Sequence, residues 1–274
     1  MVPDVPGNVY HLPANEDGRD FIVGDLHGCY DELLAMMTYV KFNPVEDRII
    51  SVGDLIDRGR KSYECLKLLD NPWFYSTRGN HEDMMYQSLV TGDPSWINDW
   101  KNNGGSWAWD WNFVATVDRG MLVNKYLKNL PLVITVGEGK DRYNVLHAEI
   151  HNGLTPVTDE DIDKWEFKNA NPTYMRERVL WSRAIIQGRL YTKAHEIQKG
   201  MSITYCGHTP IDDVVRKGAQ VYIDTGIVFG NHLTMVEHSA QKIIKYYPIG
   251  ERFLESSLTD VVDRDLTRWE KQNV

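Results

Sequence analysis

The amino-acid sequence predicts an α/β fold in which two stacked, mixed β-sheets form a β-sandwich that is flanked by helices. Three observations predict this fold. Short apolar runs alternate with helical periodicity in the first half, the second half is rich in strands, and polar motifs follow several of the runs. The chain has 274 residues, which suits one large α/β unit, so we expect a single domain over residues 1–274.

Eight apolar runs are expected to form strands because they are short and rich in β-branched and aromatic residues. They are, in chain order, Phe21–Val23, Arg48–Val52, Trp73–Thr77, Tyr143–Leu146, Ser202–Tyr205, Val221–Ile223, Leu233–Glu237 and Ile243–Tyr247. Helical periodicity is clearest at Tyr30–Val40 and Ser62–Leu69, and each of these segments directly follows a polar motif.

A tryptophan-rich segment interrupts this pattern at residues 93–130, where we expect a small helical insertion. Five of the nine tryptophans fall here: Trp96, Trp100, Trp107, Trp109 and Trp111. Two pairs are four residues apart, as on one face of a helix. Because large aromatic rings supply much packing energy, we expect them to build the core of the insertion. The alternative is a lid or substrate wall beside the polar motifs.

The C-terminal segment, residues 251–274, is expected to form an accessory helix. Ser257 with Asp260 fits a capping box, and Val262, Leu266 and Trp269 recur at helical spacing. Because a lone short helix is marginal in water, we expect it to pack on the body of its own chain. A contact with a second copy or a partner is the alternative.

Four short polar motifs follow apolar runs: GDLHG at 24–28, GDLIDRG at 53–59, GNHE at 79–82 and CGHTP at 206–210, with LHAE around His147 between the last two. Together they supply six oxygen or nitrogen ligands and no thiolate: Asp25, His27, Asp54, Asn80, His147 and His208. Such a set suits two hard or borderline divalent cations. Two cations need a carboxylate that bridges them, and Asp54 is our choice for it.

These motifs resemble those of the phosphoprotein phosphatase branch of the calcineurin-like metallophosphoesterases, in particular its short bacterial and phage members. The resemblance spans roughly residues 20–236 and implies the metallophosphoesterase type of sandwich, with metals at strand ends. It implies that one ion binds Asp25, His27 and Asp54, and that the other binds Asp54, Asn80, His147 and His208. The nitrogen and oxygen ligands suit manganese, with iron or zinc as alternatives.

The resemblance also implies the roles of four further residues. His81 would be the general acid for the leaving alkoxide, and Asp57 would hold its imidazole. Arg58 and Arg183 would bind phosphate oxygens, for which the planar guanidinium is well shaped. A hydroxide that bridges the two metals would attack phosphorus directly, so we expect no covalent phosphoenzyme.

We therefore expect a metal-dependent serine/threonine protein phosphatase, with phosphotyrosine as a possible further substrate. A dinucleoside polyphosphate hydrolase, of the diadenosine tetraphosphatase type, is the alternative enzyme. A catalytically silent binding module is disfavoured because no ligand and no acid is missing from the motifs.

Composition excludes some classes of binding partner and suggests a cellular compartment. The formal net charge of −9 argues against a general nucleic-acid binder, which needs a basic face. No run is long and apolar enough to cross a bilayer, and the first twenty residues do not resemble a signal peptide, so we expect no membrane partner. Three cysteines, an odd number, favour a reducing compartment, and we expect a cytoplasmic enzyme. The sequence carries no signal for an oligomeric state.

Overall fold

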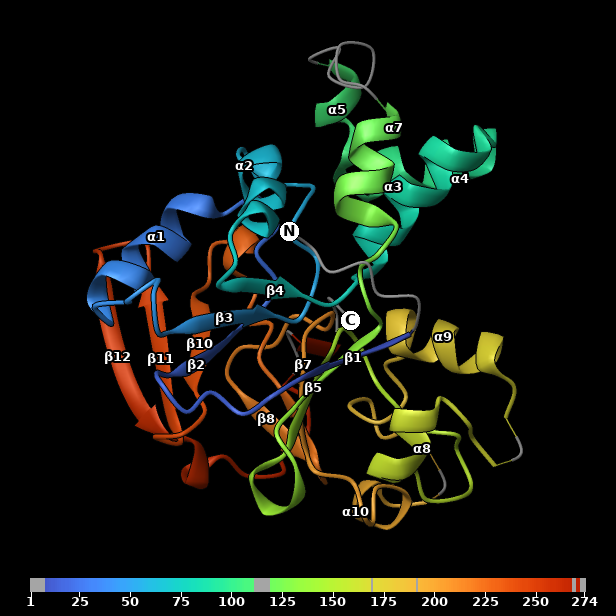
Figure 1. Ribbon diagram of the computed structural model, residues 1–274, viewed down its shortest axis with the longest axis vertical. Helices are drawn as coiled ribbons and strands as arrows, with labels where there is room; N and C mark the ends of the chain where they lie inside the picture. The colour runs from blue at the N-terminus through green and yellow to red at the C-terminus, as the bar shows by residue number, and fades with distance from the viewer. Residues whose placement is uncertain (1–7, 111–118, 169, 191, 268–269, 272–274) are drawn as a thin grey trace.

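The computed structural model describes residues 8–110, 119–168, 170–190, 192–267 and 270–271 (Figure 1). Two six-stranded sheets form its centre. The first sheet has the order β1 (Val9–Leu12), β5 (Val133–Val136), β6 (Tyr143–Leu146), β7 (Ile203–Cys206), β9 (Gln220–Tyr222) and β8 (Val215–Lys217). The second has the order β12 (Arg252–Ser257), β11 (Lys242–Tyr247), β10 (Leu233–Glu237), β2 (Asp20–Val23), β3 (Arg48–Ser51) and β4 (Phe74–Ser76). The predicted α/β sandwich is confirmed.

Strand direction decides where the polar motifs meet. In the second sheet β2, β3 and β4 are parallel neighbours, and in the first sheet β6, β7 and β9 are parallel neighbours. The carboxyl ends of parallel strands lie at the same edge of a sheet. The loops that follow these six strands are therefore gathered into two groups, one from each sheet.

Apolar side chains fill the space between the two sheets. Ile22 and Ile50 from the second sheet pack with Val145, Tyr205 and Val221 from the first, and all five are buried. These strands are buried along most of their length because the other sheet covers one face and helices cover the other. The inner layer fixes the distance between the sheets, and so it also fixes how the two groups of loops face each other.

Helices cover both outer faces of the sandwich. On the second sheet, α1 (Tyr30–Tyr39) and α2 (Ser62–Lys67) share one apolar cluster with β2, β3 and β4. On the first sheet, α8 (Asp159–Lys164) and α9 (Pro172–Trp181) share another with β6, β7 and β9. The short α10 (Ala194–Ile197) precedes β7. The two helices predicted at 30–40 and 62–69 are confirmed, the latter as α2 followed by the 3₁₀ turn η1 (Leu68–Asp70).

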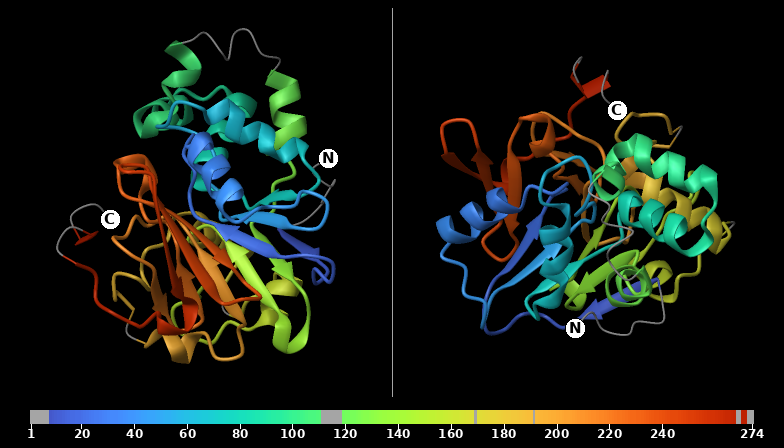
Figure 2. Two further views of the ribbon diagram at one scale, coloured as in Figure 1. Left: turned by 90° about the vertical axis from the view of Figure 1, so that its left-hand side faces the viewer. Right: turned by 90° about the horizontal axis from the view of Figure 1, so that it is seen from above.

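The tryptophan-rich segment is helical where the structure describes it. After α3 (Asn80–Thr91) come α4 (Pro94–Trp100), the π-turn η2 (Lys101–Gly105), α5 (Trp107–Asp110), α7 (Arg119–Leu122) and η3 (Val123–Leu127). Asp93 caps α4 by accepting from the Ser95 N–H, and proline occupies its first position. Figures 1 and 2 show these helices together at one end of the molecule, above the sheets. Trp111 lies outside the described residues.

The expected accessory helix at residues 251–274 is wrong over most of its length. Arg252–Ser257 form β12, an edge strand that pairs antiparallel with β11. Glu251 and Gly250 have φ of 45° and 87°, which turns the chain back into a hairpin that satisfies the backbone of β12. Ser257 caps only the 3₁₀ turn η6 (Leu258–Asp260), and residues 261–267 have no regular structure. Trp269 lies outside the described residues.

The sequence also left four strands unpredicted: β1, β5, β8 and β12. β1 and β8 are short edge strands of the first sheet, where pairing with a neighbour decides the structure more than local pattern does. No helix in the described parts of the chain has both the length and the apolar character needed to cross a membrane.

Candidate functional site

The loops that follow the parallel strands bring the predicted site residues to one end of the sandwich. All of these residues except Arg183 follow a strand or begin a helix, so the sheet behind them fixes their backbone. Asp25 and His27 follow β2; Asp54, Asp57 and Arg58 follow β3; Asn80 and His81 begin α3 after β4; His147 follows β6; Arg183 follows α9; and His208 follows β7.

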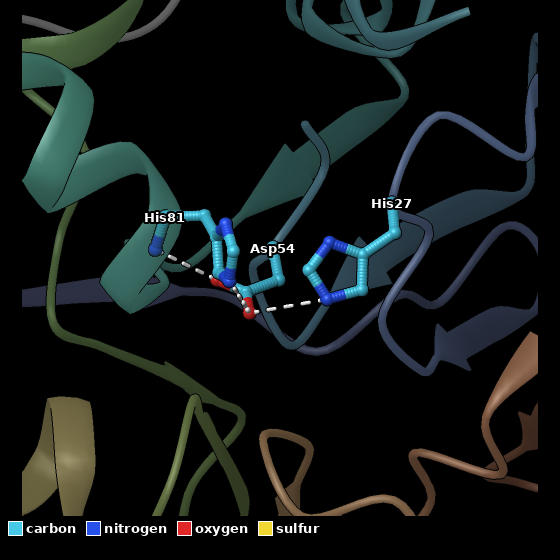
Figure 3. Close-up of side chains that lie close together, drawn as sticks. All are labelled: His27, Asp54 and His81. Atoms are coloured by element: carbon cyan, nitrogen blue, oxygen red, sulfur yellow. Dashed lines mark hydrogen bonds and ion pairs between the residues drawn. The ribbon is translucent and has the colours of Figure 1, made fainter. Parts of the chain in front are cut away.

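One group of possible metal ligands consists of His27, Asp54 and His81, shown in Figure 3. The Nε2 atoms of His27 and His81 lie 3.5 and 3.8 Å from Asp54 Oδ2. All three side chains are at most 3% exposed. The carboxylate therefore has imidazole nitrogens on two sides and almost no access to solvent.

A second group consists of Asp54, His147 and His208, so both groups share Asp54. His147 Nε2 lies 3.5 Å from Asp54 Oδ2. Asn80 Oδ1 lies 2.8 Å from His147 Nε2 and 3.0 Å from His208 Nδ1. Asp54 thus lies between the two groups, and its role as the bridge between two metal ions stays a prediction.

The hydrogen bonds of the histidine rings fit metal binding. His27 Nδ1 and His147 Nδ1 donate to the carbonyls of Ile56 and Val52 at 2.8 and 3.0 Å, and His208 Nε2 donates to the carbonyl of Trp181 at 3.3 Å. A neutral imidazole carries one N–H, so the other ring nitrogen of each has a lone pair directed into the site. Carbonyl acceptors of this kind orient metal-binding histidines.

The lone pairs of His147 and His208 both face Asn80 Oδ1, which is itself an acceptor. Three electron-rich atoms that converge in this way repel one another, and a divalent cation between them would convert the repulsion into coordination. The donor set therefore fits a metal ion.

Asp25 reaches the site but contacts a different group. Both of its carboxylate oxygens accept from the backbone N–H of His208, at 3.2 and 3.1 Å. A Cβ atom on Gly207 would lie 1.9 Å from Asp25 Oδ1, so only glycine allows this approach. Asp25 is absent from the two groups of converging donor atoms found among the described residues. Its role as a ligand stays a prediction.

Protonation states agree with cation binding. Burial lowers the pKa of His27, His147 and His208, so all three are neutral near pH 7. Burial alone would raise the pKa of Asp54, but the surrounding histidines hold it below its usual value. Burial, followed by repulsion from Asp224 and Asp54, raises the pKa of Asp25. Cations would relieve this repulsion between buried carboxylates.

His81 and Asp57 form the pair expected of a general acid and its orienting carboxylate. His81 Nδ1 donates to Asp57 Oδ2 at 2.6 Å, which leaves Nε2 directed toward Asp54. Burial opposes protonation of His81, but Asp54 and then Asp57 outweigh it and raise the pKa of this histidine. The ring is therefore protonated at a higher pH than an ordinary histidine, as a proton donor requires.

The two predicted phosphate-binding arginines border the same cluster. The Arg58 guanidinium donates to His27 Nε2, and it lies 5.5 Å from the centre of the Phe229 ring. Arg183 Nη2 donates to the carbonyl of His208 at 3.2 Å. Burial lowers the pKa of Arg183, which remains a cation.

Five site residues have a left-handed backbone, which L-residues rarely adopt. Their φ angles are 42° at His27, 49° at Asp54, 75° at Asp57, 66° at Arg58 and 67° at His208. Each such residue costs on the order of 1–2 kcal/mol. The turns after β2, β3 and β7 thus aim their side chains at one point at the expense of relaxed backbone geometry.

Sequence reasoning missed three buried carboxylates. Asp224 follows β9 and accepts from the Gly226 N–H; burial raises its pKa to about 6. Glu82 accepts from four backbone N–H groups of the loops that carry Asp54 and Asn80. Glu149 holds the turn of Arg183. The pattern of a strand followed by an acid at Val221–Ile223 could have revealed Asp224, whereas the two glutamates stood within quoted motifs without an assigned role.

Comparisons with known proteins agree with this geometry. The family model described as calcineurin-like phosphoesterase matches residues 21–236. "Serine/threonine-protein phosphatase 2" of Salmonella typhimurium is 35% identical over 217 residues, covering 78% of this chain and 90% of that protein.

Two further similarities concern a relative that matches half of this chain and a solved structure that matches most of it at low sequence identity. "Bis(5'-nucleosyl)-tetraphosphatase, symmetrical" of Actinobacillus pleuropneumoniae is 36% identical over 138 residues, covering 50% of this chain and 45% of that protein. The solved cold-active protein-tyrosine phosphatase of a psychrophilic Shewanella aligns with a TM-score of 0.58 at 16% identity, covering 94% of this chain and 84% of that one. The structural likeness shows the fold alone.

Proposed function

Because the chain belongs to the calcineurin-like phosphoesterase family, we propose that this metallophosphoesterase is a phosphoprotein phosphatase acting on phosphoserine and phosphothreonine, with phosphotyrosine as a further substrate. One observation carries the proposal. Asp54 lies between two groups of histidines, the His81–Asp57 pair adjoins it, and Arg58 and Arg183 contact two of those histidines. The family uses a dinuclear divalent metal centre, which these ligands suit.

The donor set leads us to propose manganese as the working metal, with iron or zinc as alternatives. Asp25, His27 and Asp54 would hold one ion, and Asp54, Asn80, His147 and His208 the other. When bound, two divalent cations supply an acidified water and neutralise charge on the phosphoryl oxygens.

The chain's own residues supply the remaining chemistry. Arg58 and Arg183 would bind terminal oxygens of the phosphate, where guanidinium groups add direction to charge. His81 would donate its Nε2 proton to the departing alkoxide, while Asp57 keeps Nδ1–H in place. Because a phosphomonoester dianion presents three terminal oxygens, two arginines together with cations can surround it.

A dinucleoside polyphosphate hydrolase is the second candidate, and two exposed aromatic rings favour it. Trp181 is 36% exposed and packs edge-on against His208, with 6.1 Å between ring centres. Phe229, at the end of η5 (Ile227–Phe229), is 57% exposed beside Arg58. Such rings could stack on the two bases of a dinucleotide.

The test compares the two substrates with manganese present. We expect a much higher kcat/KM for phosphoserine peptides than for diadenosine tetraphosphate, and loss of both activities on chelation. The Asp54→Asn protein, purified in parallel, measures contaminating phosphatase. A clear preference for the dinucleotide, together with a raised KM for it in Trp181→Ala and Phe229→Ala, would overturn the protein phosphatase assignment in favour of the second candidate.

A further inference from the structure

We propose that the indole N–H groups of Trp100 and Trp107 are positioning groups for the general acid His81, acting through Asp57. Two residues of the tryptophan insertion, defined here as α4 to α5 (Pro94–Asp110), then assist catalysis, while the rest of the insertion is a packed subdomain. The inference rests on the proposed function in one respect, which is that His81 protonates a leaving oxygen.

Three N–H groups converge on the Asp57 carboxylate. Trp100 Nε1 donates to Oδ1 and Oδ2 at 3.1 and 3.0 Å, and Trp107 Nε1 donates to Oδ1 at 2.8 Å. His81 Nδ1 donates to Oδ2 at 2.6 Å. Asp57 is fully buried, so these donors take the place of water around its charge. Both oxygens are fixed, and the carboxylate cannot rotate without breaking a charge-assisted bond.

Two glycines allow the insertion to come this close. The Gly104 carbonyl accepts from the Arg58 N–H at 3.2 Å. A Cβ atom on Gly104, where φ is 108°, would lie 2.7 Å from Arg58 Cγ, and one on Gly105 would lie 2.4 Å from Trp100 Nε1. A larger residue at Gly104 would push the insertion away from the Asp57–Arg58 turn, and one at Gly105 would displace the Trp100 ring that donates to Asp57. The insertion therefore contacts the turn that carries both the orienting carboxylate and a phosphate-binding arginine.

The arrangement has a chemical consequence for His81. The direction of the Nδ1–H bond sets the plane of the imidazole and hence the position of Nε2, the atom that would give up the proton. Indole donors do not titrate, so they hold Asp57 in the same orientation at every pH. A carboxylate with fewer donors can tilt, and a small misplacement of an acid costs rate.

A role in packing alone is the competing explanation, and phenylalanine separates the two. Trp100 is fully buried with Leu122, Tyr126 and Leu127, and its ring supplies packing energy whether or not its N–H is used. Phenylalanine keeps an aromatic ring and removes the donor. Trp96 provides a matched control. It is partly buried and lies one turn before Trp100 on α4, but the indole groups that donate to Asp57 are those of Trp100 and Trp107.

The experiment uses the full chain with manganese and three variants: Trp100→Phe, Trp107→Phe and Trp96→Phe. The rate is measured on a phosphoserine peptide, whose alkoxide needs a proton, and on para-nitrophenyl phosphate, whose phenolate does not. We expect each of the first two variants to lower kcat on the peptide on the order of tenfold, the loss of one bond to a charged group. The aryl ester and the control variant should change little, with metal content unchanged.

Equal losses on both substrates, or no loss on either, in a folded and metal-loaded Trp107→Phe protein would overturn the proposal. A double-mutant cycle with His81→Asn sharpens this: Trp107→Phe should add nothing once the acid is gone, and multiplying effects would mean that the indole acts elsewhere. Trp107 carries the test if Trp100→Phe fails to fold, because it is less buried. If the wild type prefers diadenosine tetraphosphate, the proposed function fails, but the same cycle measured on an alkyl phosphate, whose leaving group needs a proton, still decides the inference.

Discussion

The two halves of the site are built in different ways. The first half-site consists of the loops after β2, β3 and β4, and its backbone is held by Glu82, which accepts only from backbone N–H groups. The second half-site consists of the loops after β6, β7 and β9 together with the Arg183 turn. Its buried carboxylate, Glu149, accepts from two backbone N–H groups and two hydroxyls, those of Ser182 and Tyr222.

The difference shows which half tolerates change. Four of the five strained site residues lie in the first half-site, which also carries His81, the proposed acid. Its geometry depends on short loops whose backbone N–H groups are held by Glu82. The second half-site has a longer connection to Arg183 and hydroxyl donors that can rotate, so it can adapt to a lost hydrogen bond. We expect substitutions in the first half-site to cost more.

Asp54→Asn should have the largest effect because it removes the one group that both halves share. We expect at least ~10³-fold lower kcat/KM, corresponding to several kcal/mol of charge stabilisation, and loss of bound metal. Steady-state rates and elemental analysis measure the two effects. Asp20→Asn is the matched control: this buried carboxylate pairs with Arg48 at 2.7 Å at the opposite end of β2 and should lower stability only. Normal turnover in Asp54→Asn would remove the two-metal assignment.

His81→Asn tests the acid of the first half-site. We expect a loss on the order of 10²–10⁴ in kcat on phosphoserine peptides, the usual worth of a positioned proton donor. The loss should be smaller on para-nitrophenyl phosphate because its leaving group needs no proton. An equal loss on both esters at unchanged metal content would count against His81.

The pH dependence of the same substrates gives a further test. Asp54 and Asp57 raise the pKa of His81 above its ordinary value of 6.5. In the metal-free protein the His81 ring should therefore stay protonated above pH 6.5, which NMR titration of the ring measures. In the metal-loaded enzyme, where nearby cations oppose protonation, kcat/KM on the peptide should fall about tenfold per pH unit above the pKa that the ring has there. His81→Asn should lack this alkaline limb. A His81 ring that titrates below pH 6.5 in the metal-free protein would contradict the raised pKa.

Glu82→Gln and Glu149→Gln compare the two halves directly. The new amide NH₂ faces two backbone N–H groups in Glu82→Gln, whichever way it turns, but only one in Glu149→Gln, where a hydroxyl can rotate to accept. Each donor left unpaired costs about 1–3 kcal/mol. Denaturant unfolding should therefore show the larger loss for Glu82→Gln, accompanied by weaker metal binding. Equal losses would mean that the two carboxylates hold their half-sites alike, and the reverse order would mean that the second half-site depends more on its carboxylate.

A truncation after Asp260 should have the smallest effect on catalysis. It keeps β12 paired with β11 and removes Leu266, which packs on the first sheet, and Glu270, which accepts from the Asp212 N–H at 2.8 Å. We expect a stability loss of about 1–3 kcal/mol, with the rate on para-nitrophenyl phosphate within about twofold. A folded but inactive truncated protein would place the tail in the site.

Features that depend on neighbouring residues could be predicted from the sequence, whereas contacts between distant parts of the chain could not. The metal-binding motifs are local, because each places its side chains a few residues after a strand, and the eight predicted strands and their loops were found for that reason. Asp25 and His208 are 183 residues apart, and their contact depends on how two sheets stack. The bonds from Trp100 and Trp107 to Asp57 span 43 and 50 residues, and helical spacing gives no sign of them. β12 was missed because a hairpin partner decided its structure.

The left-handed backbone of the site has a consequence for the relation between activity and stability. At Arg58 glycine would relieve a φ of 66°, so Arg58→Gly should be about 1 kcal/mol more resistant to denaturant than Arg58→Ala, although both lack the guanidinium that we propose binds phosphate. If alanine proves the more stable, the turn is not strained. The strained residues of the site thus lower the stability of the fold that carries them. A homologue that is no longer selected for catalysis could gain thermal stability by replacing these residues.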